Sequence, residues 1–230
     1  MNIYISVEIT SRELDSKLLL ATLAAARGHQ VIVSDLESIL KGTLNGALAP
    51  GIFHTKSLTP ADHKITRYKF FTDKGFKITS LDEEAGLDLD NYEEFSRTRF
   101  SDQMIEQASA VFGWGNDDVD TLKKLYSKHA SKIHKTGSPR VDLWKSLFSD
   151  YWGVSKSTPK RPFLLVSSNM SNANGMMPTY LRIKMRTKSG YYKRKPTLLS
   201  EEFTRSADNT LKTSAFIEAI KYLVNHNKGY

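Results

Sequence analysis

The chain opens with an apolar run followed by a stretch of helical periodicity. The run Ile3 to Val7 is rich in β-branched residues, and Arg12 to Arg27 repeats apolar or small residues every three or four positions. Ser11 stands where a helix N-cap is expected, Gly28 ends the helix, and His29 to Ser34 predicts a second strand. This succession predicts a βαβ unit with parallel strands and a right-handed crossover. The residues that recur at helical spacing are Leu14, Leu18, Leu19, Thr22 and Ala26.

The same alternation continues to about residue 152. Repeated strands and helices with short links predict an α/β fold, a Rossmann-like doubly wound parallel sheet with helices on both faces. Further strands are expected at Gly51–His54, Phe76–Leu81, Ala110–Gly113 and Lys132–Lys135, and further helices at Ala61–Lys74, Ser101–Gln107, Asp117–His129 and Val141–Trp152.

A second region follows a polar, proline-containing segment. We expect a first domain at residues 1–154, a linker at 155–162 and a second region at 163–230. In that region Phe163–Ser167 predicts a strand and Thr213–Asn225 a helix. One strand and one helix are too few to close a core, so the region either packs on the first domain or is the incomplete beginning of a second α/β domain.

Composition narrows the class of protein. The sequence has no cysteine, which excludes disulfides, thiolate metal sites and cysteine nucleophiles. The N-terminal residues lack a signal-peptide pattern, and no apolar run approaches the roughly 18 residues of a spanning helix. We therefore expect a cytoplasmic protein, with contact at the inner face of a membrane left open.

The net charge of +8, from 33 Lys plus Arg against 25 Asp plus Glu, is concentrated between Arg182 and Lys195. Three interpretations are open for this basic run: a solvated surface, attraction to an anionic lipid headgroup or sugar nucleotide, and nucleic-acid binding. Because the rest of the chain shows no nucleic-acid module, we do not expect nucleic acid as a partner.

Candidate chemistry lies at the predicted carboxyl ends of the strands, where ligands of parallel α/β sheets bind. The first strand leads into Glu8 and Arg12, without the Gly-x-Gly-x-x-Gly fingerprint of an NAD-dependent oxidoreductase. A cation in the first turn of a helix opposes the helix dipole. Arg12 is therefore expected to have a partner, either an acidic neighbour such as Glu8 or an anionic ligand.

Three adjacent carboxylates, Asp82, Glu83 and Glu84, follow the strand that ends at Leu81. Mutual repulsion would raise the pKa of one of them and suit it to act as a general base. The alternative is a solvated acidic turn capped by Gly86. The local sequence offers too few further ligands for a metal cluster, so no metal site is predicted.

Two more strand ends carry charged residues. Arg140 and Asp142 fall in the first turn of a helix after a Gly-Ser-Pro turn, either as a mutual brace or as a charged lip of a cleft. His54 and Lys56 follow the third strand in the same way. A single histidine beside an apolar run is also compatible with a packed, hydrogen-bonded side chain.

Taken together, several segments resemble the surface carbohydrate biosynthesis protein family. More remotely, TGSPRVD resembles the Gly-x-Pro-Arg-x-Asp segment of the CDP-glycerol glycerophosphotransferases. The resemblance runs from the N-terminus to at least Asp142, and the region through PFLLVSSNMSNAN extends it. The segments that carry it are VEITSRELDSKLLLATLAAARGH, GIFHTKS, SLDEEAG, VFGWG and TGSPRVDL.

This resemblance implies a GT-B-type glycosyltransferase, in which the first of two Rossmann-like domains holds the acceptor and the second the nucleotide-linked donor. It implies transfer from a nucleotide sugar to a glycan or lipid-linked acceptor, with no cofactor beyond that co-substrate. Members of the family continue into an Arg-Pro-His-Pro segment, which this sequence lacks, so we expect a portion of such an enzyme. The expected catalytic residues are Glu83, Glu84 and Asp142, and the expected substrate-binding residues are Glu8, Arg12, His54, Lys56, Arg140 and Asn169.

Two alternatives stay open. One is a GT-B-fold sugar-nucleotide epimerase or a polyol-phosphate transferase, which changes the reaction but not the fold. The other is a non-catalytic binding domain of a glycan-assembly complex.

Overall fold

The computed structural model divides the chain into two units, Met1–Gly153 and Val154–Tyr230. The predicted linker, Asn169 and the predicted cap Gly86 lie outside the described residues. The structure describes residues 1–85, 92–153, 163–167, 177–193 and 197–227.

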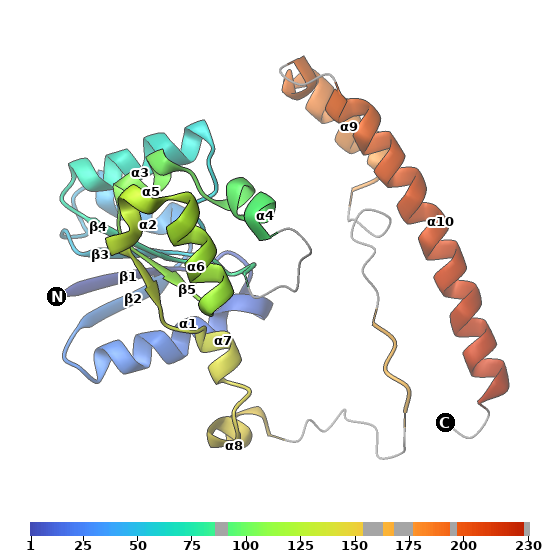
Figure 1. Cartoon of the computed structure of the whole chain (residues 1–230), viewed down its shortest axis with the longest axis horizontal. Helices are drawn as coiled ribbons and strands as arrows, with labels where there is room; N and C mark the ends of the chain where they lie inside the picture. The colour runs from blue at the N-terminus through green and yellow to red at the C-terminus, as the bar shows by residue number, and fades with distance from the viewer. Residues whose placement is uncertain (86–91, 154–162, 168–176, 194–196, 228–230) are drawn as a thin grey trace. The chain divides into compact units, whose positions relative to one another are not determined.

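The first unit is built on six parallel strands in the order β2-β1-β3-β4-β5-β6 (Figure 1). The prediction of a Rossmann-like α/β fold with a parallel sheet is therefore confirmed. The strands are β1 (Asn2–Ser6), β2 (Gln30–Ser34), β3 (Ile52–Thr55), β4 (Lys77–Leu81), β5 (Ala108–Gly113) and β6 (Ile133–Lys135). The helices are α1 (Thr10–Ala25), α2 (Leu36–Leu44), α3 (Asp62–Asp73), α4 (Tyr92–Arg99), α5 (Asp102–Gln107), α6 (Asn116–Leu125), η1 (Ser127–Lys132), α7 (Pro139–Asp142), η2 (Ser146–Phe148) and α8 (Ser149–Trp152).

The main core lies on one face of the sheet, under α2, α3, α5 and α6. Because side chains alternate between faces along a strand, every second residue of each inner strand points into this layer. Phe53 of β3 stacks on Phe71 of α3 with ring centroids 4.5 Å apart. The buried residues of the cluster are Tyr4, Ile39, Phe53, Leu58, Tyr68, Phe71, Phe76, Ile78, Phe100, Met104, Ile105, Ala108, Val111, Val119, Leu122, Tyr126 and Ile133.

Helix α1 lies on the opposite face and differs from the prediction (Figure 1). Its fully buried positions are polar: Glu13, Ser16 and Lys17. Leu18, predicted on the apolar face, is 42% exposed. The predicted N-cap is also wrong, because the helix begins at Thr10 and Ser11 lies inside its first turn. Glu13 and Lys17 tolerate burial because they have ion partners there.

Other differences concern helix boundaries. The pattern did not predict α2 or α4. The helix expected at Val141–Trp152 is replaced by the short helices α7, η2 and α8, because Lys145 adopts an extended backbone conformation with φ −70° and ψ 152°.

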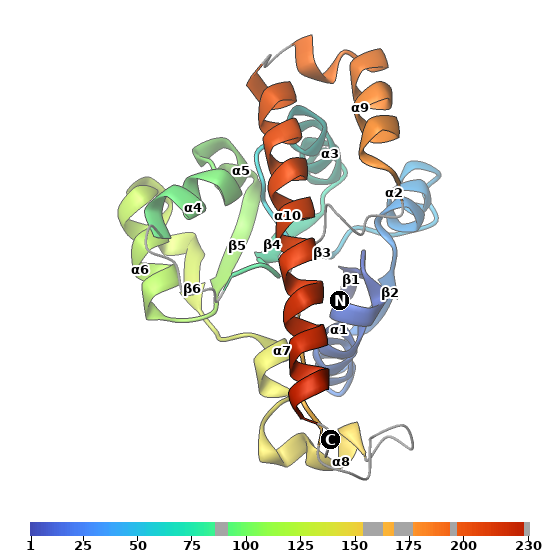
Figure 2. The ribbon, with the colours of Figure 1, turned by 90° about the vertical axis from the view of Figure 1, so that its right-hand side faces the viewer.

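The helices of the described part of the second unit are α9 (Thr179–Lys188), η3 (Tyr191–Lys193) and α10 (Thr197–His226). Helix α9 lies beside the first turns of α10 (Figure 2), where Glu202 accepts hydrogen bonds from Arg182 and Arg186. The predicted helix at Thr213–Asn225 is only the later part of α10.

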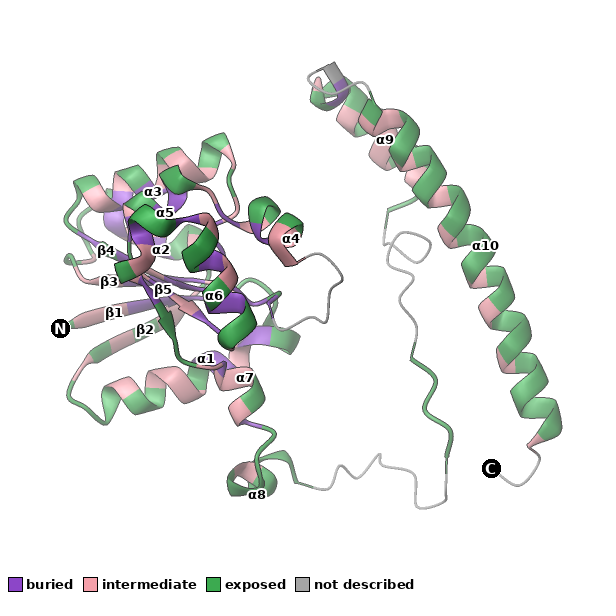
Figure 3. Cartoon of the chain, in the orientation of Figure 1, coloured by how far each residue is buried: buried purple, intermediate pink, exposed green. Residues whose placement is uncertain are grey.

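The strand predicted at Phe163–Ser167 is absent from the structure. These residues are exposed and pair with no other described strand (Figure 3), so their backbone lacks the ladder that defines a strand. Among the described residues, no helix combines the length and apolar character needed to cross a membrane.

A buried and an exposed leucine of the first unit can be compared to test which residues form its core. Leu58 is fully buried, whereas Leu44 is 61% exposed. We predict that Leu58→Ala lowers the free energy of unfolding by about 2–5 kcal/mol, because it removes buried methyl groups and leaves a cavity. The same change at Leu44 should cost less than about 0.5 kcal/mol.

Urea unfolding followed by tryptophan fluorescence measures both values. The signal reports the first unit, because all three tryptophans (Trp114, Trp144 and Trp152) belong to it. Equal losses for the two variants would contradict this assignment of the core.

Candidate functional site

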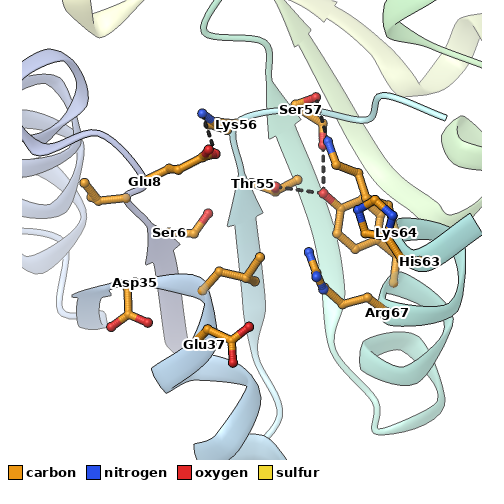
Figure 4. Close-up of a pocket in the computed structure, with 13 residues that line it drawn as sticks. Ser6, Glu8, Asp35, Glu37, Thr55, Lys56, Ser57, His63, Lys64 and Arg67 are labelled. Atoms are coloured by element: carbon orange, nitrogen blue, oxygen red, sulfur yellow. Dashed lines mark hydrogen bonds and ion pairs between the residues drawn. The ribbon is translucent and has the colours of Figure 1, made fainter. Parts of the chain in front are cut away.

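The sheet order places a switch point between β1 and β3. β1 is followed by α1 on one face, whereas β3 is followed by α3 on the other (Figure 1). The loops after β1 and β3 therefore diverge, which leaves a crevice outside the carboxyl ends of these strands. A cavity of about 400 Å³ occupies this position (Figure 4).

The walls of this switch-point cavity come from four parts of the chain. Ser6 and Glu8 belong to the end of β1, and Lys56 to the end of β3. Glu37 of α2 and Arg67 of α3 complete it on two sides. Hydroxyl, carboxylate and cationic groups thus surround one space of ordinary ligand-pocket size.

Beside the cavity, the carboxylate of Glu13 is completely buried at the N-terminus of α1. It accepts the Glu8 N–H at 3.0 Å and lies 3.1 Å from both Arg12 and Lys56. Burial raises the pKa of Glu13, but these hydrogen bonds and charges outweigh it and lower the pKa overall. Glu13 is therefore held as an anion where dinucleotide-binding folds bind a phosphate.

Lys56 forms ion pairs with both the buried Glu13 and the exposed Glu8. Its Nζ lies 2.6 Å from Glu8 and 3.1 Å from Glu13. Burial lowers the pKa of Lys56, but the two carboxylates outweigh it and raise the pKa overall. The expectation that Arg12 has an acidic neighbour as partner is confirmed, but the neighbour is Glu13 and, at 4.0 Å, Glu84. It is not Glu8, which binds Lys56.

Glu83 is the centre of a second buried ion cluster. Its carboxylate lies 2.7 Å from Lys17 and 2.9 Å from Arg140, and both Glu83 and Lys17 are almost fully buried. This contradicts a solvated acidic turn at Glu83. The predicted brace between Arg140 and Asp142 is also wrong, because Asp142 pairs with the exposed Lys145 at 2.6 Å.

The other two carboxylates after β4 share one guanidinium. Arg99 donates two hydrogen bonds of 2.8 Å to Asp82 and one of 2.9 Å to Glu84. Each of the three adjacent carboxylates therefore faces a cation, which offsets the repulsion expected from the sequence. Glu84 differs from its two neighbours because its side chain is 47% exposed.

His54 lies on the opposite face of the sheet from the main core, in a separate cavity of about 330 Å³ with a mostly apolar lining. Its Nδ1 is 3.0 Å from the Thr79 hydroxyl, and its buried Nε2 has no hydrogen-bond partner among the described residues. Burial, reinforced by the nearby charge of Lys17, lowers the pKa of His54 to about 3. His54 is therefore a packed, neutral side chain, as the alternative interpretation holds.

Helix α3 supplies cations that the sequence analysis did not single out. Lys64 Nζ is 3.4 Å from the Ser57 hydroxyl, and Arg67 makes no hydrogen bond or ion pair with any described residue. Burial lowers the pKa of Lys64, and the nearby Arg99 adds to this effect. The one available signal was their position in the first two turns of the helix that follows β3.

Glu13 and Lys17 were also missed. Their spacing of four residues, continued by Leu20 and Ala24, marks one face of α1 and could have indicated them. The structure brings most of the predicted site residues to one edge of the sheet. There they belong to the ion pairs around Glu13, Glu83 and Arg99, which together are called the ion network. His54 and Asp142 lie apart from this network. The predicted residues in the network are Glu8, Arg12, Lys56, Glu83, Glu84 and Arg140.

No family model, curated protein or solved structure matches this chain. Within the part of the chain that the structure describes, no three histidine, aspartate or glutamate side chains are grouped as a metal site requires. The chemistry of the switch-point cavity and its ion network thus carries the functional argument.

Breaking the buried Lys17–Glu83 ion pair should destabilise the fold. Lys17→Met should lower the free energy of unfolding by about 3–5 kcal/mol, because it removes one partner of a desolvated ion pair. Lys17→Met with Glu83→Gln should regain a large part of this loss. Lys69→Met, which breaks the exposed pair with Asp73, should cost no more than about 0.5 kcal/mol.

Urea unfolding followed by tryptophan fluorescence gives all three values. If Lys17→Met is as mild as Lys69→Met, the buried pair does not have the importance assigned to it.

Because the pKa of His54 is lowered on folding, we predict that the free energy of unfolding depends on pH. Its pKa is about 3 in the folded chain and near 6.5 when unfolded, so between these values the unfolded chain binds the extra proton. The contribution of His54 should therefore fall by about 1.4 kcal/mol for each pH unit below about 6. His54→Leu should remove this slope in urea midpoints measured from pH 7 to pH 4.5. An unchanged slope in His54→Leu would show that His54 is not the group responsible.

Proposed function

We propose that residues 1–153 form the acceptor-side domain of a glycosyltransferase of surface-polysaccharide biosynthesis that uses a nucleotide-activated sugar. The observation that carries this proposal is the cavity of about 400 Å³ at the switch point, with Glu37 on one side and Arg67 on another. A polyhydroxylated ligand with an anionic group matches such a lining, because carboxylates accept hydrogen bonds from hydroxyls and guanidinium groups bind anions. The resemblance of the strand-end segments to surface carbohydrate biosynthesis proteins supports the same function.

The three carboxylates after β4 take different roles in this proposal. Glu84 is the one of the three with a solvent-exposed side chain, so it is the acid–base candidate. Glu83 is buried between Lys17 and Arg140, and therefore acts as a positioning residue that fixes Arg140 at the edge of the sheet. Asp142 is bound to Lys145 away from both, and it has no catalytic role in this proposal.

One observation favours a second candidate function, a non-catalytic binding domain of a glycan-assembly complex. The carboxylates of the ion network, Glu84 included, each have a cation within 4.0 Å. Such pairing occupies the carboxylate oxygens with cations, whereas a general base needs an oxygen that is free to contact the substrate. A binding domain uses the same cavity without that requirement.

Transfer and binding assays on the full chain separate the two functions. The chain is incubated with labelled nucleotide sugars and with glycan or lipid-linked acceptors, and the products are read by mass spectrometry. For a transferase, we predict acceptor-dependent product and a loss in kcat of about 10²–10⁴-fold for Glu84→Gln. Glu106→Gln, an exposed change on α5 outside the ion network, is the matched control and should leave kcat unchanged.

Each result has a definite meaning. Glycan or sugar-nucleotide binding without any product supports the binding domain, and donor turnover without acceptor supports an epimerase. If no donor or acceptor either binds or reacts, the proposed function is wrong.

A further inference from the structure

The anionic position at the N-terminus of α1 is already filled. The carboxylate of Glu13 accepts the Glu8 N–H there and forms ion pairs with Arg12 and Lys56. A phosphate at the same position would meet a buried anion, so the usual phosphate site of a parallel α/β sheet is blocked in this protein.

The switch-point cavity has cationic groups elsewhere, on α3. In Figure 4, Lys64 and Arg67 line one side of the cavity, and Ser57 stands above them. Arg67 has no ion pair among the described residues, and Lys64 has only a 3.4 Å hydrogen bond to Ser57. These two side chains lie one helical turn apart and both face the cavity, and each has N–H groups that bond no described residue.

No carboxylate that lines the cavity forms an ion pair with Lys64 or Arg67, and Glu8 acts on Lys64 only from a distance. Glu8 is paired with Lys56, and Asp35 caps α2 by accepting the Ser38 N–H and hydroxyl. The side chain of Glu37 has no hydrogen bond or ion pair with any described residue, although its backbone N–H bonds Asp35. The cavity thus has cations on α3 that can bind an anion. Apart from them, the carboxylate of Glu37 on α2 can accept hydrogen bonds from a ligand.

We propose that the switch-point cavity binds the phosphate ester of a sugar, with the phosphoryl oxygens on Lys64 and Arg67 and a sugar hydroxyl on Glu37. A phosphoryl group carries about −1.5 to −2 charges, which two cations balance, and a guanidinium binds it through two parallel hydrogen bonds. The Ser57 hydroxyl accepts a hydrogen bond from Lys64 and so holds its Nζ beside the cavity. This inference names the ligand chemistry of the site and rests on the proposed function for the choice of a sugar.

Burial of Lys64 supports the same arrangement. Its pKa is lowered by desolvation first and by the nearby Arg99 next, and the carboxylates of Glu8 and Asp82 offset this only in part. A phosphoryl group beside Nζ would supply a compensating anion.

Calorimetric titration of the full chain tests the proposal. The probes are inorganic phosphate, a panel of hexose and N-acetylhexosamine 1-phosphates, and the matching free sugars. We expect at least one sugar 1-phosphate to bind more tightly than inorganic phosphate and than its own free sugar.

Variants then assign the groups. Arg67→Ala and Lys64→Met should each weaken sugar-phosphate binding at least tenfold. Lys69→Ala, which removes an equal charge from the exposed side of the same helix, should leave it unchanged. Glu37→Gln should weaken the sugar phosphate but not inorganic phosphate. If circular dichroism shows that Arg67→Ala is unfolded, Arg67→Lys replaces it, and a loss of several-fold is expected because the fork geometry is gone.

Several outcomes overturn the proposal. The phosphate site is wrong if no sugar phosphate binds, or if Arg67→Ala and Lys69→Ala behave alike. In either case, Arg67-independent binding of a free sugar or glycan leaves the proposed function standing, whereas the absence of any sugar ligand defeats both.

The same titration identifies the source of the phosphate. A nucleotide sugar that binds more tightly than the sugar 1-phosphate indicates a donor molecule. A short-chain lipid-linked sugar phosphate that binds more tightly indicates an acceptor. Both ligands present the chemistry proposed for the cavity.

Discussion

The buried carboxylate of Glu13 is the constraint around which the candidate site is arranged. A charge without solvent contact requires compensation, and Arg12, Lys56 and the Glu8 N–H supply it. These contacts bind the start of α1 to the end of β3 and close the helix N-terminus to outside anions. Among the described residues that line the cavity, the lysine and arginine without an ion pair, Lys64 and Arg67, lie on α3, so the cavity has its anion-binding side there.

The fold followed from local patterns in the sequence. All six strands lie within a few residues of their predicted positions. The apolar residues that indicated the inner strands β1, β3, β4 and β5 are there because central strands of a parallel sheet are buried on both sides. The same pattern located the strand ends, and with them Glu8, Lys56 and Glu83. Helices were less predictable: α1 buries polar residues, and its Leu18 is largely exposed, so apolar spacing indicated the wrong face.

The partners of the site residues could not be predicted, because they depend on which strands are neighbours. Lys56 reaches Glu13 only because β3 pairs directly with β1, and Glu83 reaches Lys17 only because α1 packs over the sheet. Neither relation is encoded within a single segment. The second region shows the converse, since Phe163–Ser167 has the composition of a strand but no partner among the described strands.

The central claim is that an internal carboxylate displaces the anion-binding position from α1 to α3. The most direct measurement is the mapping of backbone amide shifts by NMR while the full chain is titrated with the tightest-binding sugar 1-phosphate. We expect the largest shifts at Ser57, Lys64 and Arg67. Largest shifts between Glu8 and Arg12 would mean that the phosphate displaces Glu13 at the N-terminus of α1, and would contradict this claim.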